Sequence, residues 1–300
     1  MEKPEPGLYV VATPIGHLDD LSPRARAVLS GVDLICAEDT RKTTSLLGAL
    51  QIPRPRLGLL AVHAHNERGQ VDQILERLEA GCSVALVSDA GTPGISDPGA
   101  RLVDEAWAQG HRVTPLPGPS ALTAALSVSG FWSQEDQPVT FWGFLPSKPQ
   151  ARRQRLEAIG QRRGLAVVFE SPHRIAACLI DAAEVLGADC QALLGRELSK
   201  SYETLLRGSL GQLIEQRAEG LGRDPQSGQG EHVLVFNIQP DEALLQTSPL
   251  GLSDWASLLK ANCPPTLAAR LLSKGFGLDR QASYDLLEAL GPGRRAKSTK

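Results

Sequence analysis

Asp89 opens a loop in which acidic, glycine and proline residues are dense. Residues 88–99 read S-D-A-G-T-P-G-I-S-D-P-G and follow the apolar run at 84–87. Such a run between turn residues is typical of a strand buried on both faces of a parallel sheet. Glycines let a backbone approach a ligand closely, prolines hold the loop, and free N–H groups bind polar atoms. We therefore predict that the loop binds a ligand, through Asp89, Ala90, Gly91 and Ile95.

Two similar loops follow other expected strands. The first reads T-P-I-G (13–16) and the second reads P-L-P-G-P-S-A (115–121). Because ligands of open parallel sheets bind beyond the carboxyl ends of the strands, three such loops predict one shared pocket. The chain contains neither G-x-x-x-x-G-K-[ST] nor G-x-G-x-x-G after the first strand, which disfavours ATP on a phosphate loop and a dinucleotide. An adenosyl ligand without phosphates fits what remains, with further contacts expected from Thr13, Pro14, Gly16, Ser120 and Ala121.

A cation follows a helix-capping residue at three places. The segments are Ser22-Pro23-Arg24, Asp39-Thr40-Arg41-Lys42 and Ser171-Pro172-His173-Arg174. A cation in a first helical turn opposes the helix dipole, so helix stability does not account for it. A helix N-terminus together with a guanidinium forms an anion site, and RNA supplies phosphates. The alternative is that these cations pair with nearby carboxylates.

The segment H-A-H-N-E would place His63, His65 and Glu67 on one face of a strand. Zinc needs further ligands, and no cysteine or histidine cluster supplies them, so we predict no metal. We expect His65 to contact the substrate instead. If the reaction needs a group that accepts a proton, the candidates are Glu38, His65, Asp89 and Glu170, and the sequence does not choose among them.

Strands and helices alternate along most of the chain, which predicts an α/β fold. We expect a mostly parallel sheet in an N-terminal domain (1–130), a mixed sheet in a second domain (131–240) and a helical extension with a basic tail (241–300). The strands expected are 8–13, 32–38, 57–62, 83–88 and 112–116, then 139–144, 165–169, 190–198, 204–209 and 231–238. The helices expected are 23–29, 40–50, 66–80, 96–109, 120–129, 150–159, 172–186, 210–218, 252–261, 266–275 and 280–290, with a loop at 220–230.

Composition excludes several classes of protein. The 300 residues carry a net charge of −3 and five cysteines without a C-x-x-C pair, which disfavours a disulfide framework and fits a reducing cytoplasm. The start M-E-K-P-E-P-G does not read as a signal peptide. No apolar run approaches the ~20 residues that span a membrane. The expected protein is cytoplasmic and has no membrane partner.

A set of motifs resembles one known family, the ribosomal RNA small-subunit methyltransferase I family on the tetrapyrrole-methylase fold. The motifs are G-L-Y-V-V-A-T-P-I-G, A-E-D-T-R-K-T, H-A-H-N-E, L-V-S-D-A-G-T-P-G-I-S-D-P-G, P-L-P-G-P-S-A, G-F-L-P, E-S-P-H-R and R-E-L-S-K. They occur in the family's order over residues 7–237. The chain departs from the family pattern at His17, at Phe169, where a Tyr is usual, and at Ser199.

The resemblance implies S-adenosyl-L-methionine bound between two α/β domains, a homodimer, and 2′-O-methylation of a cytidine ribose in the decoding region of bacterial 16S ribosomal RNA. It adds Phe169, Glu170 and Leu198 to the expected cofactor site. The residues expected to bind RNA are Arg24, Arg41, Lys42, His65, Lys148, Arg174 and Lys200.

Two alternatives stay open at this point. One is an enzyme of the same fold that acts on a tetrapyrrole or on a protein histidine derivative. The cations after the caps and the basic segment 145–163 favour RNA over an uncharged small acceptor. The other alternative is a non-catalytic ribosome assembly factor, which would not need three convergent loops.

Overall fold

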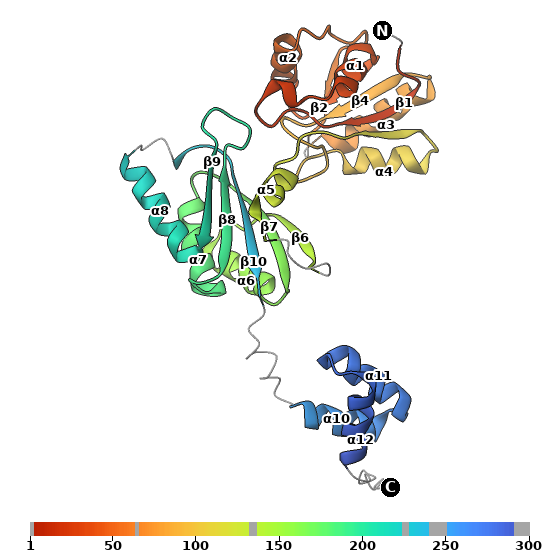
Figure 1. Cartoon of the computed structure of the whole chain (residues 1–300). Coiled ribbons are helices and arrows are strands. Elements are labelled where there is room, and N and C mark those ends of the chain that lie inside the picture. Colours follow the sequence, from red (N-terminus) through yellow and green to blue (C-terminus); the bar gives the residue numbers. More distant parts are fainter. Residues whose placement is uncertain (1–2, 64–65, 132–136, 224–227, 240–250, 291–300) are drawn as a thin grey trace. The chain divides into compact units, whose positions relative to one another are not determined.

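The computed structural model describes residues 3–63, 66–131, 137–223, 228–239 and 251–290. The chain divides into two compact units, residues 1–239 and 240–300. The first unit contains two five-stranded sheets, and the described part of the second unit is helical (Figure 1). The first unit keeps both sheets together, so the expected division at 130/131 stays a prediction.

The first sheet is parallel throughout, as predicted. Its strands have the order β3-β2-β4-β1-β5. Along β4, Ala85 and Val87 pack on one face against the core that holds Leu29 and Leu47, while Val84 and Leu86 pack on the other. Both faces are covered, which is why this strand is apolar at every position after Ser83. The strands are β1 (Gly7–Val11), β2 (Leu34–Ala37), β3 (Leu59–Ala61), β4 (Ser83–Val87) and β5 (Val113–Leu116).

Helices lie on both faces of this sheet, and most begin within a residue of the expected position (Figure 1). Ser22 and Asp39 cap their helices through side-chain oxygens, as predicted. The elements are η1 (Leu18–Asp20), α1 (Pro23–Gly31), α2 (Thr40–Ala49), α3 (Glu67–Glu79) and α4 (Ala100–Ala108). A further helix, α5 (Ala121–Ser129), follows β5 and packs on the second sheet instead.

The prediction that a helix begins at Ser96 was wrong. Helix α4 begins at Ala100, because Gly99 has a φ of 118° and turns the chain there. Glu67 caps this helix from α3, since its Oε1 accepts from the N–H of Gly99 at 3.1 Å and from that of Arg101 at 3.2 Å. The residues before Gly99 therefore stay in the loop that follows β4.

The second sheet is mixed, as predicted. Its order is β6-β7-β10-β8-β9, with β6 parallel to β7 and the other three pairs antiparallel. Helix α5 packs on one face of it through Ala125, beside Val167 and Val235. The elements are β6 (Val139–Phe144), α6 (Pro149–Gly160), β7 (Gly164–Glu170), α7 (Ile175–Leu186), β8 (Gln191–Arg196), β9 (Thr204–Ser209), α8 (Leu210–Arg223) and β10 (His232–Ile238).

Two expected boundaries in this part were wrong. Helix α7 begins at Ile175 and not at Pro172, because residues 171–174 form a turn in which Arg174 N–H donates to the Ser171 carbonyl at 3.1 Å. Helix α8 continues through Gly220 and Gly222 to Arg223, where a loop was expected. Leu210 and Leu213 bury this helix against the sheet, and packing of this kind outweighs the low helix propensity of glycine.

The second unit consists of α10 (Leu252–Asn262), α11 (Pro265–Phe276) and α12 (Arg280–Ala289), close to the three expected helices. Ala256, Ala269, Leu272 and Leu287 form its small core. Across the described residues of both units, no helix has the length and apolar character needed to cross a membrane.

Candidate functional site

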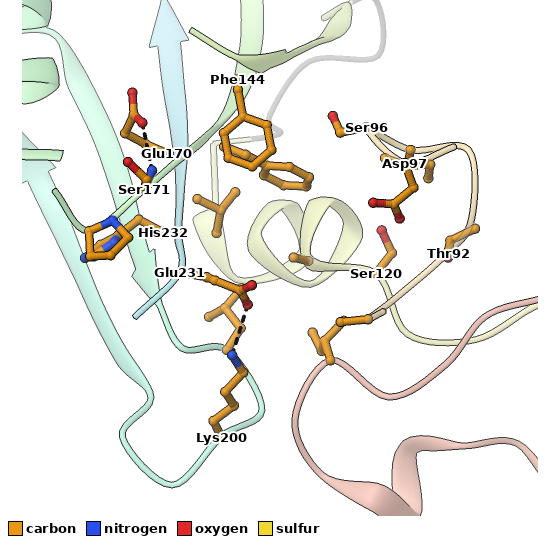
Figure 2. A pocket seen from close by; sticks show the side chains of 18 residues that line it. Thr92, Ser96, Asp97, Ser120, Phe144, Glu170, Ser171, Lys200, Glu231 and His232 are labelled. Atoms are coloured by element: carbon orange, nitrogen blue, oxygen red, sulfur yellow. Dashed lines mark hydrogen bonds and ion pairs between the residues drawn. The ribbon is translucent and has the colours of Figure 1, made fainter. Parts of the chain in front are cut away.

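A cavity of about 330 Å³ lies between the loops of the first sheet and the strand ends of the second. Figure 2 shows the two walls, with Ser96, Asp97, Thr92 and Ser120 on one side and Glu170, Ser171 and His232 on the other. The remaining lining is mostly apolar and includes Ile15, Ala90, Ile95, Ala121, Phe144, Phe169, Leu198 and Val233. An apolar pocket with a few convergent polar groups is the usual form of a small-molecule site.

The three proline-glycine loops are bonded to each other beside this cavity. Thr13 and Gly91 exchange two backbone hydrogen bonds, of 2.8 and 3.0 Å. The Thr92 hydroxyl donates to the Pro119 carbonyl at 3.0 Å. Gly91 has a φ of 83°, and a Cβ there would lie 3.2 Å from Ile15 Cγ2. The loops therefore form a rigid rim that is fixed before a ligand arrives.

The expected cofactor residues divide into two groups. The cavity is lined by Ala90, Ile95, Ser120, Ala121, Phe169, Glu170 and Leu198. Thr13, Pro14, Gly16, Asp89 and Gly91 are not among its lining residues, and Thr13 and Gly91 join two of the loops through their backbone hydrogen bonds. Gly16 is closely packed, because a Cβ there would lie 2.3 Å from the Ser199 carbonyl oxygen.

Asp89 is held by two partners. Its Oδ2 lies 2.7 Å from Lys42 Nζ, and its Oδ1 accepts from the Asp39 N–H at 3.0 Å. Burial, followed by the nearby Asp89 carboxylate, raises the pKa of Glu38. The structure thus brings together Glu38 and Asp89, two of the expected proton acceptors, with Lys42 as their counter-ion.

Asp97 completes this group of carboxylates and lines the cavity, although it was not among the expected site residues. Burial, and then the charge of Glu38, raise its pKa to about 6. The signal for it was present in the second half of the S-D-A-G-T-P-G-I-S-D-P-G loop, which the expected helix start at Ser96 had assigned to a helix instead.

Glu170 is the last residue of β7 and is 1 % exposed. Its Oε1 accepts from the Ser171 N–H at 2.7 Å and lies 2.6 Å from Arg174 Nη2. Its Oε2 is buried and has no hydrogen-bond partner within the described part of the chain. Arg174 Nε also donates to the Ser171 hydroxyl at 3.2 Å, so this hydroxyl does not cap α7 as expected.

His232 is a second lining residue that the sequence did not indicate. It lies directly opposite Glu170 on the neighbouring strand β10. Burial, and then the charges of Arg217 and Arg196, lower the pKa of His232 to about 4, so the ring is neutral at pH 7. Nothing in its strand-like surroundings G-E-H-V-L-V-F distinguishes it from a core residue.

The expected RNA-binding cations have different surroundings. Arg41 is 90 % exposed and pairs with Asp39 at 2.7 Å. Lys200 lines the cavity, and its Nζ lies 2.9 Å from a carboxylate oxygen of Glu197 and 2.9 Å from one of Glu231. Burial opposes the charge of Lys200, but the hydrogen bonds to these two carboxylates outweigh it and raise the pKa of Lys200. Arg24 and Lys148 are exposed, at the starts of α1 and α6.

The H-A-H-N-E segment is used structurally where it is described. Asn66 bonds the backbone of His63 and Ala61, and Glu67 caps α4. His65 lies outside the described residues. Among those that are described, no three His, Cys, Asp or Glu side chains are grouped so as to hold a metal ion.

Comparison with known proteins identifies the family. Residues 7–214 match the model of the Tetrapyrrole (Corrin/Porphyrin) Methylases. This chain is a member of the tetrapyrrole methylase family. Membership makes S-adenosyl-L-methionine the methyl donor, and the mostly apolar cavity, with the buried Oε2 of Glu170 in its wall, fits such a ligand.

Curated relatives match over nearly their whole length. A Xylella fastidiosa protein (strain Temecula1) is 49 % identical, and the match covers 92 % of this chain and 97 % of that protein. A Neisseria meningitidis serogroup B protein is 42 % identical, with coverage of 93 % of this chain and 92 % of that protein. A Pseudomonas aeruginosa protein is 41 % identical, with coverage of 92 % of this chain and 95 % of that protein. Each is named ribosomal RNA small subunit methyltransferase I.

Solved structures agree in fold. A cobalt precorrin-4 methyltransferase of cobalamin biosynthesis has a TM-score of 0.55 at 14 % identity and covers 78 % of this chain and 96 % of its own. A uroporphyrin-III-C-methyltransferase from Thermus thermophilus has a TM-score of 0.51 at 18 % identity, covering 77 % and 93 %. These likenesses confirm the fold class that the sequence predicted.

Proposed function

We propose that the protein transfers a methyl group from S-adenosyl-L-methionine to the ribose 2′-oxygen of a cytidine in the decoding region of bacterial 16S ribosomal RNA. The observation that carries the proposal is the similarity to relatives named ribosomal RNA small subunit methyltransferase I over more than nine-tenths of both chains. The cytidine, the 2′-oxygen and the decoding region rest on the motif resemblance alone.

The residues that would hold the cofactor are those of the two cavity walls. Ile15, Ala90 and Ile95 offer apolar contact from the first wall, and Phe169, Leu198 and Val233 from the second. S-adenosyl-L-methionine supplies an electrophilic methyl group when bound. The protein supplies orientation, which carries much of the rate of a transfer of this kind. The hydrogen bonds between the loops hold the residues of the first wall in place.

We infer that Asp97 takes the proton of the ribose hydroxyl. Both Asp89 oxygens are engaged, and Glu170 is fixed through its Oε1 by Arg174 and Ser171, which leaves only its buried Oε2 without a partner among the described residues. Asp97 faces the cavity, and its pKa of about 6 lies close to the pH at which a cytoplasmic enzyme works. A general base is most effective when its pKa is near the working pH. Its Oδ atoms would hold the proton after transfer.

We further expect a homodimer, as the resemblance implies, and a location in the cytoplasm, as the cysteine pattern indicates. Both remain predictions. Analytical ultracentrifugation of the full chain at micromolar concentration tests the first, and a monomer mass would contradict it.

The proposed function is tested by offering labelled cofactor and two acceptors, small ribosomal subunits and a uroporphyrinogen-type tetrapyrrole. Label in the RNA of the subunits supports the proposal. Label in the tetrapyrrole would replace it with the activity of the structural neighbours. Cofactor binding without transfer to either acceptor would favour a non-catalytic assembly factor.

A further inference from the structure

The second unit contains a tight pair of helices, α11 and α12. Only Gly277, Leu278 and Asp279 separate them, and Gly277 has a φ of 67°, in the left-handed region. Asp279 caps α12, because its Oδ1 accepts from the Ala282 N–H at 2.7 Å. Two helices joined by a three-residue turn that contains glycine have the form of a helix-turn-helix, a motif of nucleic-acid-binding proteins.

A groove of about 560 Å³ lies on these two helices. Arg270 and Lys274 stand one turn apart on α11, and Arg280 is the first residue of α12. Thr266, Leu267 and Ser273 complete the lining. Every ionisable side chain of the groove is therefore a cation, and two hydroxyls accompany them.

The three cations have no polar partner in the part of the unit that the structure describes. Over residues 251–290, Arg270, Lys274 and Arg280 take part in no ion pair and no side-chain hydrogen bond, whereas Lys260 donates to the Leu287 carbonyl. Three of the acids described in this unit have other partners: Asp254 accepts from the Gly251 N–H at 2.9 Å, Asp279 from the Ala282 N–H at 2.7 Å, and Asp285 from Gln281 at 2.9 Å. An exposed groove with unpaired cations and no carboxylate attracts a polyanion.

We infer that the groove between α11 and α12 binds the phosphate backbone of the RNA substrate. This inference rests on the proposed function, which makes RNA the polyanion that the protein meets. The major groove of an RNA helix is too deep and narrow to be read by side chains, so phosphates and not base edges are the expected contacts. The groove would thus add affinity and salt dependence without reading sequence.

The test removes the three charges together, in the variant Arg270→Ala/Lys274→Ala/Arg280→Ala of the full chain. Binding is measured to small subunits and to their protein-free RNA, between about 50 and 200 mM salt. Each lost phosphate contact lowers the slope of log affinity against log salt by about 0.7 to 0.9, so three contacts lower it by about 2 to 3. Over that salt range the wild-type affinity should fall about 30-fold more than that of the variant.

Two further variants guard against trivial explanations. Arg54→Ala/Arg68→Ala/Arg77→Ala removes the same charge from exposed positions of the first unit and should keep the wild-type slope. The double variant Arg270→Lys/Arg280→Lys keeps the charge and should recover most of the affinity. An unchanged slope in the alanine variant of the groove, or an equal loss in the control, would overturn the inference.

The remaining outcomes separate this inference from the proposed function. With methyl transfer intact, the groove variant should raise KM for small subunits and leave kcat and cofactor affinity unchanged. If wild-type protein transfers methyl groups but the groove variant has an unchanged KM, the inference fails alone. If the variant weakens binding to subunits but not to protein-free RNA, the groove binds a ribosomal protein and the inference is wrong. If wild-type protein transfers no methyl group to RNA, the proposed function fails first.

Discussion

At the scale of single residues, the carboxylates of the site differ in what holds them. Asp89 has a lysine on one oxygen and a backbone N–H on the other, so it is a structural anchor for the start of α2. Asp97 faces the cavity and has a raised pKa. From this difference in surroundings we propose separate roles for two carboxylates of one loop, a structural role for Asp89 and a chemical role for Asp97.

Asp97→Asn should lower kcat by about 100-fold or more, the usual contribution of a general base. In the wild type the rate should rise with pH through about 6, since the carboxyl must lose its proton before it can accept another. The variant should lack that rise. Asp104→Asn, on the exposed face of α4, is the control and should keep the wild-type profile. A wild-type pH profile in Asp97→Asn would exclude Asp97 as the base.

The same variant should be more stable than the wild type at about pH 8. The folded-state pKa of about 6 lies above that of an unfolded Asp, near ~3.9. Folding therefore favours the protonated carboxyl, and the stabilisation is present at low pH and lost as pH rises through about 6. Thermal melts at pH 5 and pH 8 measure this. A lower melting temperature for Asp97→Asn at pH 8 would contradict it.

Gly91→Ala and Gly94→Ala form a matched pair. Their φ values are 83° and 81°, so each alanine should cost about 1 kcal/mol in backbone strain. At Gly91 the new Cβ meets Ile15 in the cavity wall, whereas at Gly94 nothing lies within 4 Å. Calorimetry should therefore show at least a tenfold loss of cofactor affinity for Gly91→Ala alone. Equal losses of cofactor affinity in both variants would mean that backbone strain, and not contact with Ile15, causes the loss. Unchanged affinity in Gly91→Ala would exclude the rim from the cofactor site.

At the scale of elements, helix starts show where local rules succeed and where they fail. The caps at Ser22 and Asp39 follow from residue type. The Ser22 hydroxyl accepts from the Ala25 N–H, and Asp39 Oδ1 accepts from the Arg41 N–H although the Arg41 side chain binds the same carboxylate. At Ser171 the rule fails. The Ser171 N–H donates to the Glu170 carboxylate, and Arg174 Nε donates to the Ser171 hydroxyl. The chain therefore forms a turn before α7 begins. The capping rule considers only the residues at the helix start, so it does not account for Glu170, which ends the preceding strand.

Arg174→Ala should act on stability and not on RNA binding. The variant leaves the carboxylate of Glu170, which is fully buried, without its ion pair, at a cost of about 2 kcal/mol. This reverses the expectation from sequence, which favoured a phosphate contact. Arg24→Ala, at an exposed start of α1, should change stability by less than about 0.5 kcal/mol. Denaturant unfolding and salt-dependent RNA binding of both variants distinguish a structural ion pair from a phosphate contact. A lower salt slope with unchanged stability for Arg174→Ala would favour the phosphate contact.

Glu67→Ala should destabilise the start of α4. Its carboxylate binds two N–H groups there, and loss of a cap of this kind costs about 1 kcal/mol. Because α4 follows the loop that carries Asp97, cofactor affinity should fall as well. Glu76→Ala, on the exposed face of α3, is the control. Wild-type stability in Glu67→Ala would mean that water replaces the cap without loss.

At the scale of the whole molecule, alternation of apolar runs and helical patterns predicted both sheets, with their parallel and mixed character. It also indicated that three loops meet. The strand order and the pairing of Glu170 with His232 could not be predicted, because they depend on contacts between segments far apart in the chain. The same holds for the packing of α5 on the second sheet, which crosses the expected domain boundary.

The most direct measurement of the central claim is mass-spectrometric mapping of small-subunit RNA after reaction with the purified protein and labelled S-adenosyl-L-methionine. We predict one labelled nucleotide, a cytidine of the decoding region that carries the methyl group on its 2′-oxygen, and a greatly reduced yield with Asp97→Asn. A methyl group on a base, label spread over many nucleotides, or no label in the RNA would contradict it.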